Sequence, residues 1–154
     1  MNDKQCDFCS DELYQKQNIL KGNHIRVWYP IRPVVFGHFM LITKRHIELF
    51  TELTSVELIE IRELTDAIFK TFKRNGASDG FNILNNNLRE AGQHIAHTHI
   101  HVLMRKKGEM SPFKILSNNA YREKISDKEW SARVEKLRTW MTKETNYENI
   151  NYNS

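Results

Sequence analysis

The sequence lacks long apolar runs, a set of cysteines and a strong excess of charge of either sign. Without a stretch of about 18 apolar residues, no membrane-spanning helix is expected. The N-terminal residues lack the apolar core of a secretory signal, so we expect a cytoplasmic protein. Two cysteines are too few for the disulfide framework of a small secreted domain. The net charge of +4 is spread along the chain, which favours anionic ligands and gives no reason to expect binding to duplex nucleic acid.

Internal repeats and low-complexity linkers are also missing. Of the 154 residues, 40% are hydrophobic, which suits one domain with a sizeable core. We therefore expect a single domain over residues 1–145. Residues 146–154 are rich in Asn and Tyr and are expected to form a flexible tail.

Short runs of β-branched and aromatic residues, separated by proline or polar residues, predict strands. The first two runs are joined by a loop that contains Pro30 and Pro33, and we expect them to form an antiparallel hairpin. The predicted strands cover His24–Tyr29, Gly37–Thr43, Phe81–Leu84 and Ile95–Met104.

Apolar residues at helical spacing predict two amphipathic helices. Thr54 and Glu57 form a capping-box pattern before the first helix, which we expect over residues 55–75 with Gly76 as its C-terminal cap. A second capping-box pattern begins a helix that is expected to continue to Lys143. Together these elements predict an α+β fold, an antiparallel sheet of about five strands with one long helix and a C-terminal helix.

The most informative segment is the run His97-Thr-His-Ile-His-Val-Leu103. In a strand, alternate residues share a face, so His97, His99 and His101 would lie in a row, opposite the β-branched residues between them. An imidazole can act as a nucleophile, a proton carrier or a metal ligand near neutral pH. The residues alone leave open covalent catalysis or one metal ion held by all three histidines. A spacing of about 6.6–6.8 Å between alternate Cα atoms of a strand makes a shared ion awkward.

The same run resembles the motif of the histidine triad (HIT) family, in the form Gly92-Gln93-x-Ile95-x-His97-x-His99-x-His101-Val102-Leu103. Residues 31–38 and 41–47 resemble the family's first hairpin, and residues 80–87 resemble the strand that precedes the triad. The resemblance covers residues 5–105. It implies a HIT-like fold and a homodimer with the long helix and a strand at its interface.

The resemblance implies a nucleotidyl hydrolase or transferase that cleaves at the α-phosphate of nucleoside phosphoramidates or dinucleoside polyphosphates. His99 would attack the phosphorus and form a covalent nucleotidyl–histidine intermediate, and His101 would hydrogen-bond the phosphate or leaving-group oxygen. Asn86 and Gln93 match positions that contact phosphate in the family, and Ile31 matches a residue near the nucleoside. The alternative is a nucleotide-binding regulatory or scaffold protein with little turnover.

The pair Cys6-x-x-Cys9 is a metal or redox motif. Redox pairs of the thioredoxin type follow a strand, whereas only five residues precede Cys6. The chain resembles a branch of the HIT family with an N-terminal Cys-x-x-Cys, and this resemblance implies a structural zinc bound by Cys6, Cys9, His46 and His97. The other two histidines of the triad would then remain for chemistry.

Some positions depart from the family's pattern. Pro30 stands where many members have an Asp or Asn that binds ribose hydroxyls. His94 stands where Ser or Thr is usual, and we expect a solvated loop residue or a cation near the phosphate. His38, in the second strand, is expected to serve as a structural hydrogen-bonding residue.

Overall fold

The computed structural model describes residues 6–111, 114 and 124–142. The predicted tail, residues 146–154, lies outside this part of the chain. Among the described residues, no helix has both the length and the apolar character needed to cross a membrane.

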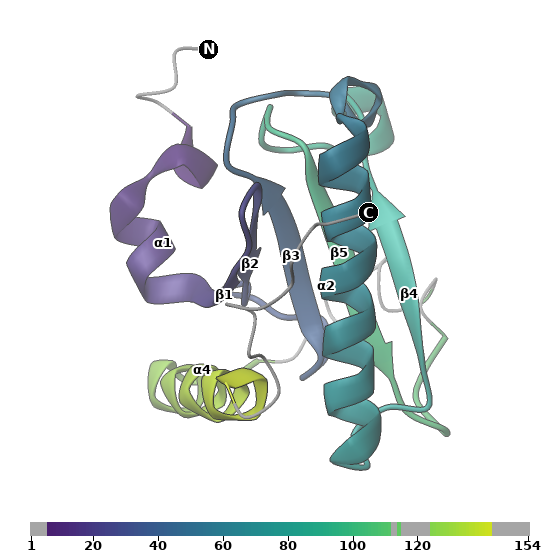
Figure 1. Cartoon of the computed structure of the whole chain (residues 1–154). Coiled ribbons are helices and arrows are strands. Elements are labelled where there is room, and N and C mark those ends of the chain that lie inside the picture. The colour runs from purple at the N-terminus through teal and green to yellow at the C-terminus, as the bar shows by residue number, and fades with distance from the viewer. Residues whose placement is uncertain (1–5, 112–113, 115–123, 143–154) are drawn as a thin grey trace.

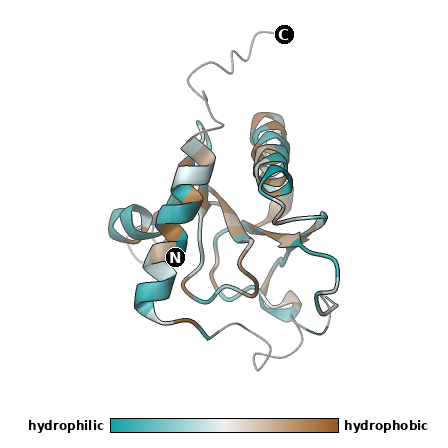
Figure 2. Cartoon of the chain, turned by 90° about the horizontal axis from the view of Figure 1, so that it is seen from below, coloured by the Kyte–Doolittle hydropathy of each residue, from teal (hydrophilic) through white to brown (hydrophobic). Residues whose placement is uncertain are grey.

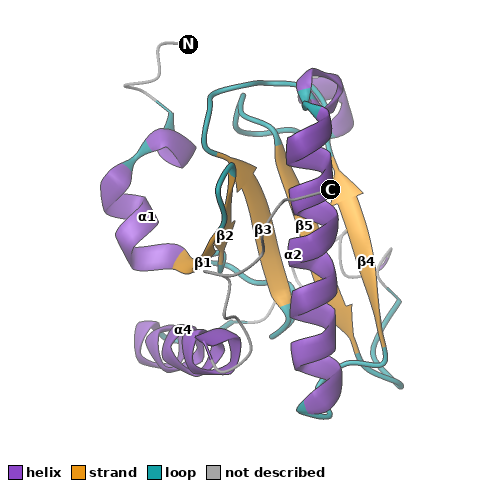
Figure 3. Cartoon of the chain, in the orientation of Figure 1, coloured by secondary structure: helices purple, strands orange, loops and turns teal. Residues whose placement is uncertain are grey.

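A five-stranded antiparallel sheet forms the centre of the fold (Figures 1 and 3). The strand order is β1-β2-β3-β5-β4, so β1 and β4 are the two edges. The predicted α+β class and the antiparallel pairing of the first two predicted strands, now β2 and β3, are confirmed. The strands are β1 (Asn18–Lys21), β2 (Ile25–Trp28), β3 (His38–Thr43), β4 (Gly80–Asn85) and β5 (His99–Arg105).

Both predicted helices are present, as α2 (Ser55–Arg74) and α4 (Asp127–Thr142). The hydroxyl of Thr54 accepts a hydrogen bond from the Glu57 N–H, and the Glu57 carboxylate accepts one from the Thr54 N–H, as the capping-box pattern predicts. Just beyond α2, Gly76 has φ of +64°, a conformation that favours glycine. The shorter helices are α1 (Asp11–Gln17), η2 (Asp7–Cys9), η3 (Phe50–Glu52) and η4 (Arg89–Ala91).

The two faces of the sheet pack against different parts of the chain. On one face, apolar residues of β2, β3 and β5 form the main core with α2 and α4, as with Val27, Leu41 and Ile100. On the other face, Trp28, Met40 and Ile42 pack against the N-terminal segment around Cys6 and Phe8. Figure 2 shows the strands mostly brown, whereas the helices carry both brown and teal residues. Alternate side chains of β3 and β5 therefore face away from the main core and toward the N-terminal segment, where a site can form.

Two elements were not predicted from the sequence, the helix α1 and the edge strand β1. Ser10 caps α1 by accepting a hydrogen bond from the Leu13 N–H, a local signal that the sequence contains. The four-residue strand β1 pairs with β2 through an irregular register, so it has no clear period-two pattern. Together they bring residues 6–21 over the second face and one edge of the sheet (Figure 1).

The strand that carries the histidine run begins later than predicted. β5 begins at His99, whereas the expected strand covered Ile95–Met104. His97 instead lies in a bend, where its N–H donates to the Ile95 carbonyl, and the next N–H, of Thr98, donates to the Ile47 carbonyl. These two bonds take the backbone donors of His97 and Thr98, so His97 leaves the regular row formed by His99 and His101.

Candidate metal centre and nucleotide cavity

Four side chains from three segments meet where the N-terminal segment covers the sheet. Cys6 and Cys9 come from η2 and its cap, His46 from the loop after β3, and His97 from the bend before β5. Their ligand atoms all lie within 4.8 Å of one another, so the group could hold a metal ion. The structure therefore brings together all four residues of the predicted zinc site, and the two cysteines form no disulfide.

The spacing of these atoms fits a tetrahedral zinc ion. The Cys6 Sγ lies 3.4 Å from the His97 Nδ1, and the Cys9 Sγ lies 3.4 Å from the His46 Nδ1 and 3.6 Å from the His97 Nδ1. Zn–S bonds of about 2.3 Å and Zn–N bonds of about 2.05 Å at tetrahedral angles give S–N separations of about 3.55 Å. These three S–N distances are thus compatible with a metal ion held between the four side chains.

The outer nitrogen of His97 is also fixed. Its Nε2 lies 2.9 Å from the Thr43 carbonyl and 3.0 Å from the Thr43 hydroxyl. A proton on Nε2 leaves the Nδ1 lone pair directed at the cysteine sulfurs, the arrangement that a metal-binding histidine needs. Burial lowers the pKa of His97 to about 4, so the ring is neutral at physiological pH.

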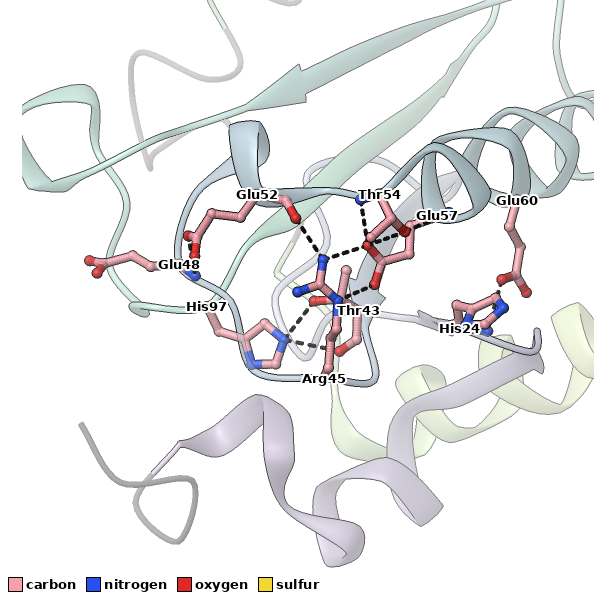
Figure 4. Close-up of polar contacts among 9 residues, drawn as sticks. All are labelled: His24, Thr43, Arg45, Glu48, Glu52, Thr54, Glu57, Glu60 and His97. Atoms are coloured by element: carbon pink, nitrogen blue, oxygen red, sulfur yellow. Dashed lines mark hydrogen bonds and ion pairs between the residues drawn. The ribbon is translucent and has the colours of Figure 1, made fainter.

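An ion pair holds the loop that carries His46 against α2 (Figure 4). The Nε and NH2 groups of Arg45 each lie 2.7 Å from an oxygen of Glu57, and NH2 also donates to the Glu52 carbonyl. The Arg45 hydrogen bond, with further bonds from Thr54, lowers the pKa of Glu57 to about 2. This bidentate pair restricts the backbone next to His46, a member of the candidate cluster.

A cavity of about 600 Å³ adjoins the metal cluster on the same face of the sheet. Its walls include His99 and His101 of β5, His38 at the start of β3 and Phe8 of η2. The Phe8 ring makes edge contacts with both His97 and His99, with centroid distances of 5.9 Å and 5.0 Å. A single aromatic ring therefore separates the metal cluster from the cavity.

His99 uses its Nδ1 for a hydrogen bond, and this bond fixes the position of the ring's proton. Its Nδ1 lies 2.9 Å from the His97 carbonyl, which can only accept, so Nδ1 carries the proton. The lone pair of a neutral His99 is then on Nε2. Burial lowers the pKa of His99, which keeps the ring neutral and the lone pair present at physiological pH.

His101 has the opposite arrangement because of His38. The Val34 N–H donates to the His38 Nδ1 over 3.1 Å, so the proton of a neutral His38 is on Nε2. That Nε2 lies 2.9 Å from the His101 Nδ1 and donates to it. His101 therefore carries its own proton on Nε2, and the two triad histidines of the cavity present an acceptor and a donor.

The sequence matches a known protein family. A family model described as HIT domain matches residues 13–108. The chain belongs to the HIT family. An uncharacterised HIT-like protein of Methanocaldococcus jannaschii is 33% identical over 107 residues, which cover 68% of this chain and 81% of the relative.

Two further matches connect the HIT family to chemistry and to metal. The asymmetrical bis(5′-nucleosyl)-tetraphosphatase of Schizosaccharomyces pombe is 29% identical over 89 residues, which cover 53% of this chain and 44% of the enzyme. The crystal structure of a zinc-bound histidine triad family protein from Mycobacterium smegmatis superposes with a TM-score of 0.70 at 20% identity, covering 94% of this chain and all of the other. The second match establishes the HIT fold, and the first shows that the family includes nucleotide hydrolases.

The three residues predicted to bind nucleotide, Ile31, Asn86 and Gln93, do not all lie at the cavity. Asn86 and the exposed side chain of Ile31 line the cavity with His99 and His101. Gln93 is not among the lining residues, and its amide bonds to the backbone of two loops. It donates to the Glu48 carbonyl and accepts from the Leu88 N–H, which holds the loop that carries Asn86 and Gly92.

The cavity also contains residues that the HIT motif alone did not indicate. Phe8 and Gln17 enter it because the N-terminal segment folds back over the sheet. His38, expected to be structural, makes its hydrogen bond to a triad histidine. His94 lines the cavity, and its charge contributes after burial to the lowered pKa of His99.

A metal ion shared by all three triad histidines is not supported by the described residues. Within them, the group of metal-ligating side chains contains His97 but neither His99 nor His101. The Nδ1 atoms of these two histidines face the His97 carbonyl and His38. His97 thus belongs to the metal cluster and the other two belong to the cavity.

Proposed function

We propose that the protein is a HIT-type nucleotidyl hydrolase or transferase that cleaves at the α-phosphate of nucleoside phosphoramidates or dinucleoside polyphosphates. The observation that carries the proposal is the pair of opposed tautomers in one cavity. His99 offers a lone pair at Nε2, and His101 offers an N–H at the equivalent nitrogen. A nucleophile beside a hydrogen-bond donor is the minimum equipment for attack on a phosphoryl group.

In the first step, the Nε2 lone pair of His99 forms a bond to the α-phosphorus. The bond from phosphorus to the leaving group breaks, and its electron pair departs with the leaving group. The N-phosphorylated ring carries a positive charge, which the hydrogen bond from Nδ1 to the His97 carbonyl stabilises. The Nε2–H of His101 donates to an oxygen of the phosphate or the leaving group and stabilises the negative charge there.

In the second step, water or another acceptor attacks the nucleotidyl–histidine. A new bond to phosphorus forms, the P–N bond breaks with its electron pair returning to the His99 Nε2, and the acceptor's proton leaves to solvent. Splitting one displacement into two in this way is the general benefit of covalent catalysis. The acceptor, water or a second nucleophile, determines whether the outcome is hydrolysis or transfer.

The loop before β5 supplies the proposed phosphate contacts. Asn86 lines the cavity, and its amide is only weakly engaged, 3.4 Å from the Gly92 carbonyl. Gly92 has φ of +86° and also lines the cavity, so backbone without a side chain borders the space for the phosphate. Ile31, at the other side, would pack on the nucleoside. Gln93 would act indirectly, by holding this loop.

We also propose that zinc is the resident metal of the cluster formed by Cys6, Cys9, His46 and His97. Two thiolates and two imidazoles at tetrahedral spacing favour zinc over harder cations. A reducing compartment such as the cytoplasm would keep the thiols available to it. When bound, zinc would fix η2 to the sheet and contribute directly to folding stability. The chain's own residues, Phe8 above all, would transmit that order to the cavity wall.

The proposed assembly is a homodimer through the edge of the sheet beside α2. Phe81 and Ile83 of the edge strand β4 and Leu58 of α2 are exposed apolar residues that line a shallow groove of about 470 Å³. An unpaired edge strand with an apolar border favours antiparallel pairing with a second copy. Sedimentation analysis of wild-type protein and of the Ile83→Lys variant tests this, with a dimer expected only for the wild type.

Isotope labelling tests the proposed reaction. Diadenosine tetraphosphate is incubated with the enzyme in H₂¹⁸O, and the products are analysed by mass spectrometry. Attack at the α-phosphorus places ¹⁸O in the AMP released, and alkaline quenching preserves an adenylyl group on the peptide that contains His99. If the label appears only in the larger product, cleavage at the α-phosphate is wrong. Tight binding of nucleotide without labelled product would favour a nucleotide-binding scaffold instead.

A further inference from the structure

The cavity is also lined by an amide that has no hydrogen-bond partner among the described residues. Gln17, the last residue of α1, lines the cavity and is only 5% exposed. Its backbone carbonyl accepts a hydrogen bond from the Tyr29 N–H. Within the described part of the chain, its side-chain amide makes no hydrogen bond, although it offers two donors and one acceptor oxygen.

The amide faces the cavity, where a bound molecule can supply the hydrogen bonds that the described residues do not. Polar atoms of two neighbouring residues also lack partners among the described residues. One is the buried indole Nε1 of Trp28, which also lines the cavity. The other is the buried Oδ1 of Asn18, the next residue in the chain. A ligand that supplies hydrogen bonds to these groups would satisfy them on binding.

The position of Gln17 in the sheet shows which part of a ligand it would meet. Gln17 leads directly into β1, and the order β1-β2-β3-β5 separates β1 from the histidines of β5 by three strand spacings. At about 4.8 Å per spacing, the backbones are about 14 Å apart. A nucleotide whose phosphorus lies at His99 can extend across β3 and β2, which places its base on the side of Gln17.

The neighbours of Gln17 favour a flat heteroaromatic ring at this end. Leu13 and Trp28 line the cavity beside Gln17, with apolar and aromatic side chains, and the Phe8 ring lies between Trp28 and His99. A nucleobase stacks or packs on such surfaces and has adjacent donor and acceptor groups along its edge. A glutamine amide matches an adjacent donor and acceptor with two hydrogen bonds, as it does in its pairing with adenine.

We propose that Gln17 is a specificity-determining residue whose side-chain amide hydrogen-bonds the edge of the substrate's nucleobase. The proposal rests on the nucleotidyl chemistry proposed above and adds the group that reads the base. The amide would accept from an exocyclic amine through Oε1 and donate to the adjacent ring nitrogen through Nε2. A substrate that lacks the amine leaves Oε1 buried and unpaired, so it should bind less well.

The test compares three substrates that differ in one group each. They are the 5′-phosphoramidates of adenosine, of purine riboside, which lacks the exocyclic amine, and of 2′-deoxyadenosine, which lacks a ribose hydroxyl. For the wild-type enzyme we expect kcat/KM for purine riboside to fall by about 10-fold relative to adenosine, mainly through KM. In the Gln17→Leu variant we expect the ratio of the two values to approach one.

The matched control is Gln15→Leu, the same substitution at an exposed position of the same helix. It should keep the wild-type ratio. Equal rates for adenosine and purine riboside in the wild type would overturn the proposal, and so would a ratio that survives Gln17→Leu. A variant that loses discrimination only against 2′-deoxyadenosine would assign Gln17 to the sugar and not to the base. Absence of turnover and of AMP binding in the wild type would instead overturn the proposed function itself.

Discussion

The two ends of the histidine run have the same residue type but different surroundings. His97, in the bend, is fully buried and faces two sulfurs and the Thr43 carbonyl. His99 and His101, in β5, border a cavity. The difference arises because β5 begins after His97, at His99, so His97 turns toward the N-terminal segment. The role of each imidazole is therefore set by what its two nitrogens contact, and not by its place in the repeat.

Phe8 shows how closely the two regions are joined. Its ring touches His97 on one side and His99 on the other, and it lies between the two cysteines in the chain. A metal that orders the cysteines would thereby order one wall of the cavity. We therefore predict that the metal cluster is needed for folding and that the cavity is needed for catalysis.

The sharpest test of this difference is the His99→Ala variant. Removal of the proposed nucleophile should lower kcat by about 10⁴-fold or more, because no other group in the cavity offers a comparable lone pair at that position. The measurement is steady-state hydrolysis of diadenosine tetraphosphate. Circular dichroism and zinc content should match the wild type.

His24→Ala is the control for His99→Ala, because His24 is exposed and does not line the cavity. It should retain wild-type turnover. Near-normal activity of His99→Ala would remove the assignment of the nucleophile and with it the distinction between the two regions.

The double variant Cys6→Ser/Cys9→Ser tests the other side of the comparison. It should lose the zinc, one ion per chain, and its melting temperature should fall by about 10 °C or more. Elemental analysis and calorimetry measure the two effects. Activity should fall less than in His99→Ala, since the catalytic groups remain. A full equivalent of zinc in this variant would mean that the metal is held elsewhere, as in the three-histidine alternative.

Much of this division could be predicted from the sequence, because it depends on local periodicity. The alternation in β5 places His99 and His101 on one face and Ile100 and Val102 in the core. The capping box of α2 is likewise a pattern within a few residues. The ligand set of the metal cluster followed from a family resemblance, and the structure brings those four residues together.

Other parts of the site depend on long-range pairing that no local pattern encodes. His38 meets His101 because the register between β3 and β5 pairs Met40 with His101, which puts His38 diagonally beside it. Gln17 reaches the cavity because a short helix and an irregular edge strand return over the sheet. A shift of one residue in either register would turn these side chains to the other face.

His38 allows a finer test within the cavity region. The His38→Phe variant keeps the ring's size and removes its hydrogen bond to His101, so the proton of His101 is no longer confined to Nε2. We expect kcat to fall by about 10- to 100-fold with little change in KM, since the substrate contacts remain. His38→Gln, whose amide can still donate to the His101 Nδ1, should recover part of the loss. A KM effect alone, or no recovery with glutamine, would reduce His38 to a packing residue.

The smallest expected effect concerns the ion pair beside the metal cluster. In Glu57→Gln the charge that pairs with Arg45 is removed, and we expect the free energy of unfolding to fall by about 1–3 kcal/mol at neutral pH. Turnover at saturating substrate should be unchanged, because Glu57 lies on α2 and does not line the cavity. Chemical denaturation and steady-state kinetics measure the two quantities. A loss of turnover without a loss of stability would contradict the separation of the two regions.

The pH dependence of that difference tests the role of the Glu57 charge. The pKa of Glu57 is lowered from 4.5 to about 2 on folding, chiefly by the hydrogen bond from Arg45. Folding therefore favours the ionised form, and the stabilisation is complete above the unfolded pKa and is lost as the pH falls through the folded one. Wild type and Glu57→Gln should thus differ fully above pH 4.5 and converge as the pH falls toward 2. A difference that stays constant over this range would show that the carboxylate acts through its shape and hydrogen bonds, and that its charge contributes nothing to holding the His46 loop.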